Sequence, residues 1–146
     1  PFFGDFSGNI LFNALKKNRL SINNVKNGYK SVYITNSVKC YPPNNQPNLD
    51  EIKNCLTHLT QEFFLLKRLK VIIALGHIAH NSILRAYSLK MSNYKFSHGK
   101  IHKINERKLL IDSYHCSKIN INSKKLTNKM ISDILNTAKE ISYRNE

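Results

Sequence analysis

The sequence is poor in acidic residues. Nine aspartates and glutamates stand against 23 lysines and arginines, so the formal net charge at pH 7 is +14 and the pI is about 9.9. Folding itself does not require such a surplus, and the basic residues are spread along the chain instead of being gathered in a tail. This pattern favours a folded surface that faces a polyanion such as nucleic acid. The alternative is a general bias toward lysine and asparagine, which would enrich any protein surface in positive charge.

Long apolar runs and a charged leader are also lacking. No stretch approaches the roughly 18 apolar residues of a membrane span, and the first residues, PFFGDFSG, do not have the basic start of a signal peptide. We therefore expect a soluble protein without a membrane partner, in the cytoplasm and associated with the nucleoid. The chain starts at Pro1, without methionine, on a glycine-containing turn. This start predicts a fragment whose N-terminal part is absent.

Cysteine and glycine are both scarce, and each scarcity argues against a class of protein. The three cysteines, Cys40, Cys55 and Cys116, are an odd number without a close pair, which argues against a disulfide framework and leaves thiols or metal ligands. Gly76 stands alone after an apolar run, so the sequence has no glycine-rich phosphate loop. This argues against a dehydrogenase or another nucleotide-binding protein. The 146 residues suffice for one domain with a hydrophobic core, and we predict a single domain over 1–146.

The first half of the chain predicts a helix, a strand and a second helix. Apolar residues recur at helical spacing over 7–20, with Ser7 as a candidate N-cap and basic residues in the closing turns. Residues 31–40 are rich in β-branched and aromatic side chains and predict a strand that stops at the following prolines. Asn48, three residues before Glu51, then predicts a capping box at the start of a long amphipathic helix.

The second half continues the alternation. Residues 70–76 are apolar on both faces and predict an interior parallel strand, after which Gly76 leads into a helix. The segment around Asn105 and Glu106 is either the turn of a hairpin or a connection between a short strand and an interior one. An amphipathic helix over about 126–141 closes the chain. Strands alternating with helices predict a three-layer α/β/α fold with a mainly parallel central sheet.

In such a fold, functional sites lie beyond the carboxyl ends of the strands. Three loops qualify: one after Cys40, one at Gly76 and one that begins at His115. His115 follows the apolar run LLI and is itself followed by polar side chains that suit phosphates or base edges. Taken alone, a histidine at the end of a strand is more often a structural group than a catalyst.

An ordered set of motifs resembles the uracil-DNA glycosylase superfamily, and most closely its family 5 enzymes. The motifs are PFFGDFSG, VYITNSVKCYPPNNQP, KVIIALG, FSHGKIH and SYHCSKINI, and the match runs from Pro1 to about Ala138. The resemblance implies a uracil-DNA glycosylase-like fold whose first strand is missing here. It also implies an enzyme of base-excision repair that flips a deaminated base such as uracil out of DNA and hydrolyses its N-glycosidic bond.

The resemblance assigns roles to four residues around the extruded base. Phe2 would be the aromatic platform on which the base stacks, and Asn45 would lie beside the pocket. Asp5 would stand near the sugar, where it orients water or stabilises a cationic transition state. Its alternative role is to cap the first helix. His115 would donate a hydrogen bond to uracil O2 as the leaving base becomes negatively charged.

The resemblance also implies DNA contacts and a cofactor. Ser117 and Asn120 match a loop that enters the minor groove, and Lys118 and Lys125 would add nonspecific attraction to DNA. Two ligands of the family's structural [4Fe–4S] cluster match Cys40 and Cys55, but the other two ligands belong to an N-terminal part. We therefore expect no stable cluster in this chain alone, and we expect a monomer.

One departure from the family pattern bears on activity. Cys116 takes the place of the proline in the family's SYHPS motif, which removes a fixed φ angle that helps to aim the histidine. Two hypotheses follow. The first is an active glycosylase, and the alternative is an inactive, truncated remnant that retains only nonspecific DNA binding.

Overall fold

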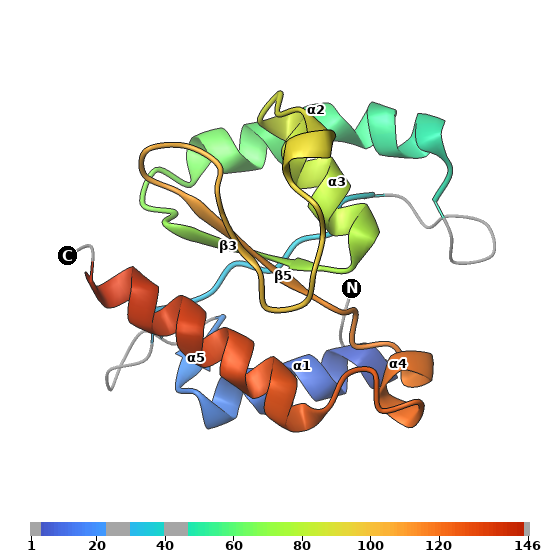
Figure 1. Cartoon of the computed structure of the whole chain (residues 1–146), viewed down its shortest axis with the longest axis vertical. Helices are drawn as coiled ribbons and strands as arrows, with labels where there is room; N and C mark the ends of the chain where they lie inside the picture. Colours follow the sequence, from blue (N-terminus) through green and yellow to red (C-terminus); the bar gives the residue numbers. More distant parts are fainter. Residues whose placement is uncertain (1–3, 23–29, 40–46, 145–146) are drawn as a thin grey trace. The chain divides into compact units, whose positions relative to one another are not determined.

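The computed structural model describes residues 4–22, 30–39 and 47–144. These residues form two compact units, coloured along the chain in Figure 1. Unit 1 consists of the described residues up to 34 together with those from 113 onward, and unit 2 consists of those between 35 and 112. The single domain over 1–146 stays a prediction.

Two helices form the body of unit 1. Helix α1 (Phe6–Lys17) packs against α5 (Asn128–Arg144). Asn18, which ends α1, donates from its side chain to Ser132 Oγ over 2.9 Å and accepts at its carbonyl from Lys139 Nζ over 3.0 Å. The predicted closing helix is confirmed. The buried apolar side chains of the unit come from both helices, from their flanks and from Cys116: Leu11, Ala14, Leu15, Leu20, Cys116, Leu126, Ile131, Ile134, Leu135 and Ala138.

The start of α1 differs from the prediction. Asp5, not Ser7, is the N-cap, and its Oδ1 accepts a hydrogen bond from the Gly8 amide over 2.5 Å. An aspartate satisfies the free amides of the first turn and also places a negative charge at the positive end of the helix dipole. The capping role considered for Asp5 is therefore confirmed.

The strand predicted over 31–40 is wrong for the part that the structure describes. Strand β1 (Leu20–Ser21) and strand β2 (Lys30–Ser31) form a two-residue parallel ladder, and residues 32–39 are not in a strand. A β-branched sequence fits an extended conformation, but a strand needs a neighbour along its length for its backbone hydrogen bonds. The short β1 offers such a neighbour only as far as Val32, whose amide donates to Ser21 over 2.9 Å.

The second helix matches the sequence pattern closely. Helix α2 (Leu49–Leu65) begins at Asn48, whose side chain accepts from the Glu51 amide over 2.8 Å while the Glu51 carboxylate accepts from the Asn48 amide over 2.8 Å. This reciprocal pair is the predicted capping box. The apolar stripe of α2 is buried at Ile52, Cys55, Leu59 and Phe63.

Unit 2 contains a three-stranded mixed sheet. Strand β5 (Leu109–Ser113) lies in the middle, between β3 (Val71–Leu75) and β4 (Ile101–Lys103). Strands β4 and β5 are antiparallel, which confirms the hairpin alternative and makes β5 the interior strand of this sheet. In the described residues β3 is an edge strand with alternating burial, so the prediction of an interior strand there is wrong.

Helices and sheet share one core in unit 2. Gly76, with φ of 97°, turns the chain from β3 into α3 (His77–Ala86), a backbone conformation that favours glycine. Helices α2 and α3 pack with the strands (Figure 1) around Leu59, Phe63, Ile72, Ala74, Ile83, Leu84, Ile104 and Leu110. A short 3₁₀ helix, η3 (Met91–Asn93), follows α3. The fold is thus α/β, as predicted, and no helix in the described ranges is both long and apolar enough to cross a membrane.

Candidate functional site

His115 lies two residues beyond the end of β5. The last residues of the strand, Asp112 and Ser113, are fully buried, whereas the His115 side chain reaches solvent. Protein nevertheless surrounds enough of the ring to lower the pKa of His115 below its ordinary value of 6.5, since partial burial disfavours the charged form. The imidazole is therefore neutral at pH 7 and has one N–H to donate.

Asp5 acts on the same imidazole through its charge. The Asp5 carboxylate raises the pKa of His115 and so opposes the larger effect of burial. Asp5 is exposed and caps α1 at the same time. The Asp5 carboxylate thus caps the start of α1 and also lies within electrostatic reach of the His115 imidazole.

A short helix that the sequence did not predict follows His115. Helix α4 (Lys118–Asn122) begins at Ser117, whose hydroxyl accepts from the Asn120 amide over 3.3 Å. The Asn120 side chain donates from Nδ2 to the carbonyl of His115 over 2.9 Å, and its own carbonyl accepts from the Leu126 amide over 3.0 Å. Ser117 is a typical N-cap residue type and was the available signal for this helix. Both residues therefore hold the backbone that carries His115.

The remaining residues of this segment divide into buried and exposed ones. Cys116 is 1% exposed, and burial raises the pKa of its thiol to about 11, so the thiol stays protonated at neutral pH. Lys118 is exposed, and the neighbouring Ile119 is 79% exposed, which is unusual for so apolar a side chain. Lys125 Nζ lies 4.7 Å from the centroid of the Tyr114 ring, a cation–π contact.

Unit 1 thus contains six of the predicted site residues: Asp5, His115, Ser117, Lys118, Asn120 and Lys125. Cys55 belongs to unit 2. Three other predicted residues, Phe2, Asn45 and Cys40, lie outside the described residues.

The cysteines do not fit a four-thiolate cluster. The whole sequence has three cysteines, one fewer than such a cluster needs. Cys55 is buried on the apolar stripe of α2 beside Val38 and Ile52, and its Sγ accepts from the Lys39 amide over 3.3 Å. We therefore assign no iron–sulfur chemistry to this chain.

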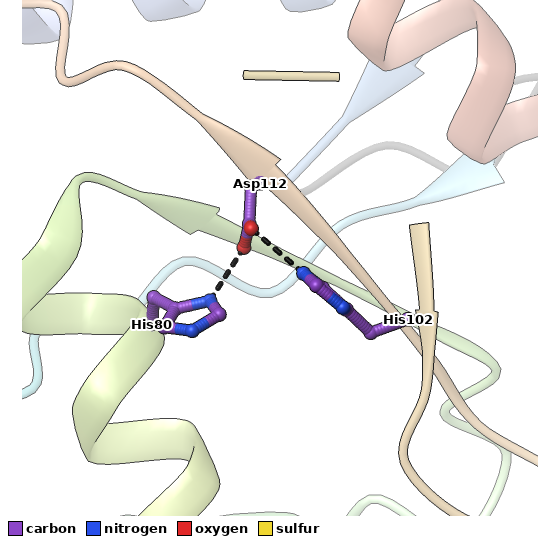
Figure 2. A group of neighbouring side chains, drawn as sticks. All are labelled: His80, His102 and Asp112. Atoms are coloured by element: carbon purple, nitrogen blue, oxygen red, sulfur yellow. Dashed lines mark hydrogen bonds and ion pairs between the residues drawn. The ribbon is translucent and has the colours of Figure 1, made fainter. Parts of the chain in front are cut away.

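A second cluster of functional side chains occurs in unit 2 and was not predicted. Figure 2 shows His80 from α3 and His102 from β4 pointing toward Asp112 on β5. His80 Nδ1 lies 2.7 Å from Asp112 Oδ1, and His102 Nε2 lies 2.8 Å from Asp112 Oδ2. All three residues are buried. Asp112 is 32 residues from His80 and 10 residues from His102, so no short sequence motif contains the cluster. Only the packing of α3 on the sheet brings the three side chains together.

Residues 1–139 match the family model of the uracil DNA glycosylase superfamily. Similar proteins include a type-5 uracil-DNA glycosylase from Thermus thermophilus, 33% identical over 147 residues, and one from Mycobacterium leprae, 32% identical over 150 residues. A type-4 uracil-DNA glycosylase from Pyrobaculum aerophilum is 42% identical over 85 residues, which cover 58% of this chain and 39% of that relative.

The matches cover this chain more fully than they cover the relatives. Both type-5 proteins align with 97% of this chain, but the chain spans 67% of the Thermus thermophilus protein and 65% of the Mycobacterium leprae protein.

Proposed function

Because this chain belongs to the uracil DNA glycosylase superfamily, we propose that it removes uracil or another deaminated base from DNA in base-excision repair. The enzyme flips the damaged nucleotide out of the duplex and hydrolyses the bond between base and sugar. For its α/β fold we propose the family's three layers and mainly parallel sheet.

The observation that carries this proposal is the neutral, solvent-reaching imidazole of His115 beyond the end of β5. As the glycosidic bond breaks, negative charge develops on uracil O2. A neutral imidazole that donates its N–H there stabilises the leaving base without a prior change of protonation. The hydrogen bond from Asn120 to the His115 carbonyl supports this geometry by limiting the movement of the backbone.

Asp5 is proposed to act on the sugar. Its charge raises the pKa of His115, which requires the two groups to be within electrostatic reach of each other. A carboxylate there favours a cationic sugar and can orient the water that attacks it. Phe2 is proposed to stack on the flipped base and Asn45 to line its pocket.

The segment after His115 is proposed to hold the DNA. Ser117 and Asn120 form its rigid turn, while Lys118 and Lys125 contribute positive charge toward phosphates. Ile119 adds an apolar tip that is 79% exposed, and such side chains are used as wedges between base steps. Exposure of this tip to solvent is explained if DNA covers it in the complex.

The alternative is a remnant that binds DNA without chemistry. One observation favours it: Cys116 stands where the resemblance places a proline. Cys40 and Cys55 would supply two of four cluster ligands in a longer protein, and no step of the proposed reaction depends on them.

Single-turnover excision from a duplex with one uracil separates the two functions. We expect the chain to release uracil and the His115→Ala variant to lose most of this activity while its DNA affinity is retained. Binding by both proteins without release of uracil by either would establish the remnant.

A further inference from the structure

The cluster of His80, His102 and Asp112 in unit 2 has no role in the proposed function. Its ligand atoms all lie within 4.8 Å of one another, and each side chain is almost wholly buried. From these contacts we propose that the cluster binds a divalent cation of the zinc type through two imidazole nitrogens and one carboxylate, which leaves a fourth tetrahedral position open.

The hydrogen bonding of His80 defines which nitrogen is free. His80 Nε2 lies 2.8 Å from the backbone carbonyl of Tyr94, which can only accept, so Nε2 carries the hydrogen. In the neutral ring the lone pair is then on Nδ1, and it faces Asp112 Oδ1 over 2.7 Å. A lone pair and a carboxylate oxygen at this distance repel each other unless a proton or a metal cation lies between them.

The contact with Tyr94 also has the form seen around metal-binding histidines. Such a histidine usually donates its second ring N–H to a carboxylate or backbone carbonyl, which orients the ring and makes the ligating nitrogen more basic. The carboxylate is supported in the same way. Asp112 Oδ2 accepts from the Ser97 amide over 3.2 Å, and the Asp112 carbonyl accepts from the Gly99 amide over 2.8 Å.

Charge gives a further reason for a cation. Asp112 is 0% exposed, and a buried carboxylate is costly unless positive charge compensates it. In the described part of the chain, the side chains that pair with Asp112 are the two histidines, and none is a lysine or arginine. A divalent cation would compensate the charge of the carboxylate and accept a lone pair from each imidazole.

The donor set and the spacing suit zinc. Two imidazole nitrogens and one carboxylate oxygen are ordinary zinc ligands. With zinc bonds of about 2.0–2.2 Å, neighbouring ligands of a tetrahedral site are separated by about 3.3 Å. Each imidazole nitrogen here faces its own carboxylate oxygen, over 2.7 Å at Oδ1 and 2.8 Å at Oδ2, so both separations must open by about half an ångström when a zinc ion enters. The cation would tie together α3, β4 and β5.

The test uses the full chain, stripped of metal with a chelator and then titrated with zinc chloride. Calorimetry and elemental analysis measure the stoichiometry, and thermal unfolding with and without zinc measures the effect on stability. The informative variant is His102→Gln, because glutamine can still donate a hydrogen bond to Asp112 but is a poor zinc ligand. His58→Gln, at an exposed position on α2, is the matched control.

We expect one zinc ion per chain in the wild type and in His58→Gln, and affinity at least about 100-fold weaker in His102→Gln. Zinc at 100 times its dissociation constant should increase the folded-to-unfolded ratio by about 100-fold in the first two proteins only. Equal binding in His102→Gln, or no stoichiometric binding in the wild type, would overturn the proposal.

Cobalt in place of zinc distinguishes this cluster from a cysteine site and does not depend on the folding of any variant. Cobalt bound by His80, His102 and Asp112 gives d–d bands without a thiolate charge-transfer band. A strong thiolate band in the wild-type complex would place the metal at cysteine and contradict the proposal.

Discussion

The side-chain amide of Asn120 donates a hydrogen bond to the carbonyl oxygen of His115 over 2.9 Å. The residue that the proposed chemistry needs is thus held by a side chain five positions further along the chain. Ser117 caps α4, the helix that contains Asn120. The segment from His115 to Asn120 is therefore a closed, hydrogen-bonded turn. Asn120 is therefore a positioning residue for His115.

Replacement of Asn120 by aspartate tests this role. A carboxylate keeps the size of the side chain but cannot donate to the His115 carbonyl. We expect the rate of single-turnover excision to fall about 10-fold or more, because slight misplacement of a catalytic group is costly, while DNA affinity falls by less. Asn136→Asp is the control, since Asn136 donates from its side chain to Glu140 on the exposed side of α5. A loss of affinity alone would instead assign Asn120 to direct DNA contact.

The pKa of His115 can be measured by NMR titration of its ring protons, identified by their absence in His115→Ala. We expect a value below 6.5 in the folded protein, because partial burial disfavours the imidazolium ion. Protonation then favours the unfolded state, so this group lowers stability as the pH falls below 6.5. A pKa above 6.5 would contradict the dominant effect of burial on this ring.

Asp5→Asn should lower the pKa of His115 further. Asparagine is as good an N-cap as aspartate, so α1 keeps its start while the negative charge that favours the imidazolium ion is lost. The same NMR titration, with circular dichroism to confirm the helix, measures the change. An unchanged pKa would show that Asp5 only caps the helix.

Several elements were predictable because a local pattern determines them. Asn48 and Glu51 form their capping box within one turn of the chain, and the apolar stripe that follows is buried as its spacing predicts. The strand over 31–40 failed because strand formation depends on a partner elsewhere in the sequence. The same reason explains why the sequence did not predict the cluster of His80, His102 and Asp112, since tertiary packing alone brings these residues together. His115 and Asp5 were found through the family motifs, and their catalytic roles stay predictions.

The thiol of Cys116 should resist alkylation in the native protein. Its side chain is 1% exposed, and burial raises its pKa to about 11, so little thiolate exists at pH 8. We expect iodoacetamide to modify the peptide that contains Cys116 only after unfolding, as mapped by mass spectrometry. Rapid modification under native conditions would show that the turn after His115 opens readily.

Lys118→Gln should weaken DNA binding on every sequence. Lys118 is exposed at the start of α4, and loss of one phosphate contact reduces the slope of log affinity against log salt by about 1. Lys129→Gln is the control, because Lys129 is already paired with Asp133 at 3.0 Å on α5. Equal salt slopes in the two variants would show that Lys118 does not contact a DNA phosphate.

The most direct test of the central claim is single-turnover release of uracil from a labelled duplex by the wild type and by His115→Ala. The account predicts release by the wild type and a rate about 10²- to 10³-fold lower in the variant, with DNA affinity changed little, since the imidazole acts on charge that develops only as the bond breaks. Equal rates in the two proteins would contradict the role of His115.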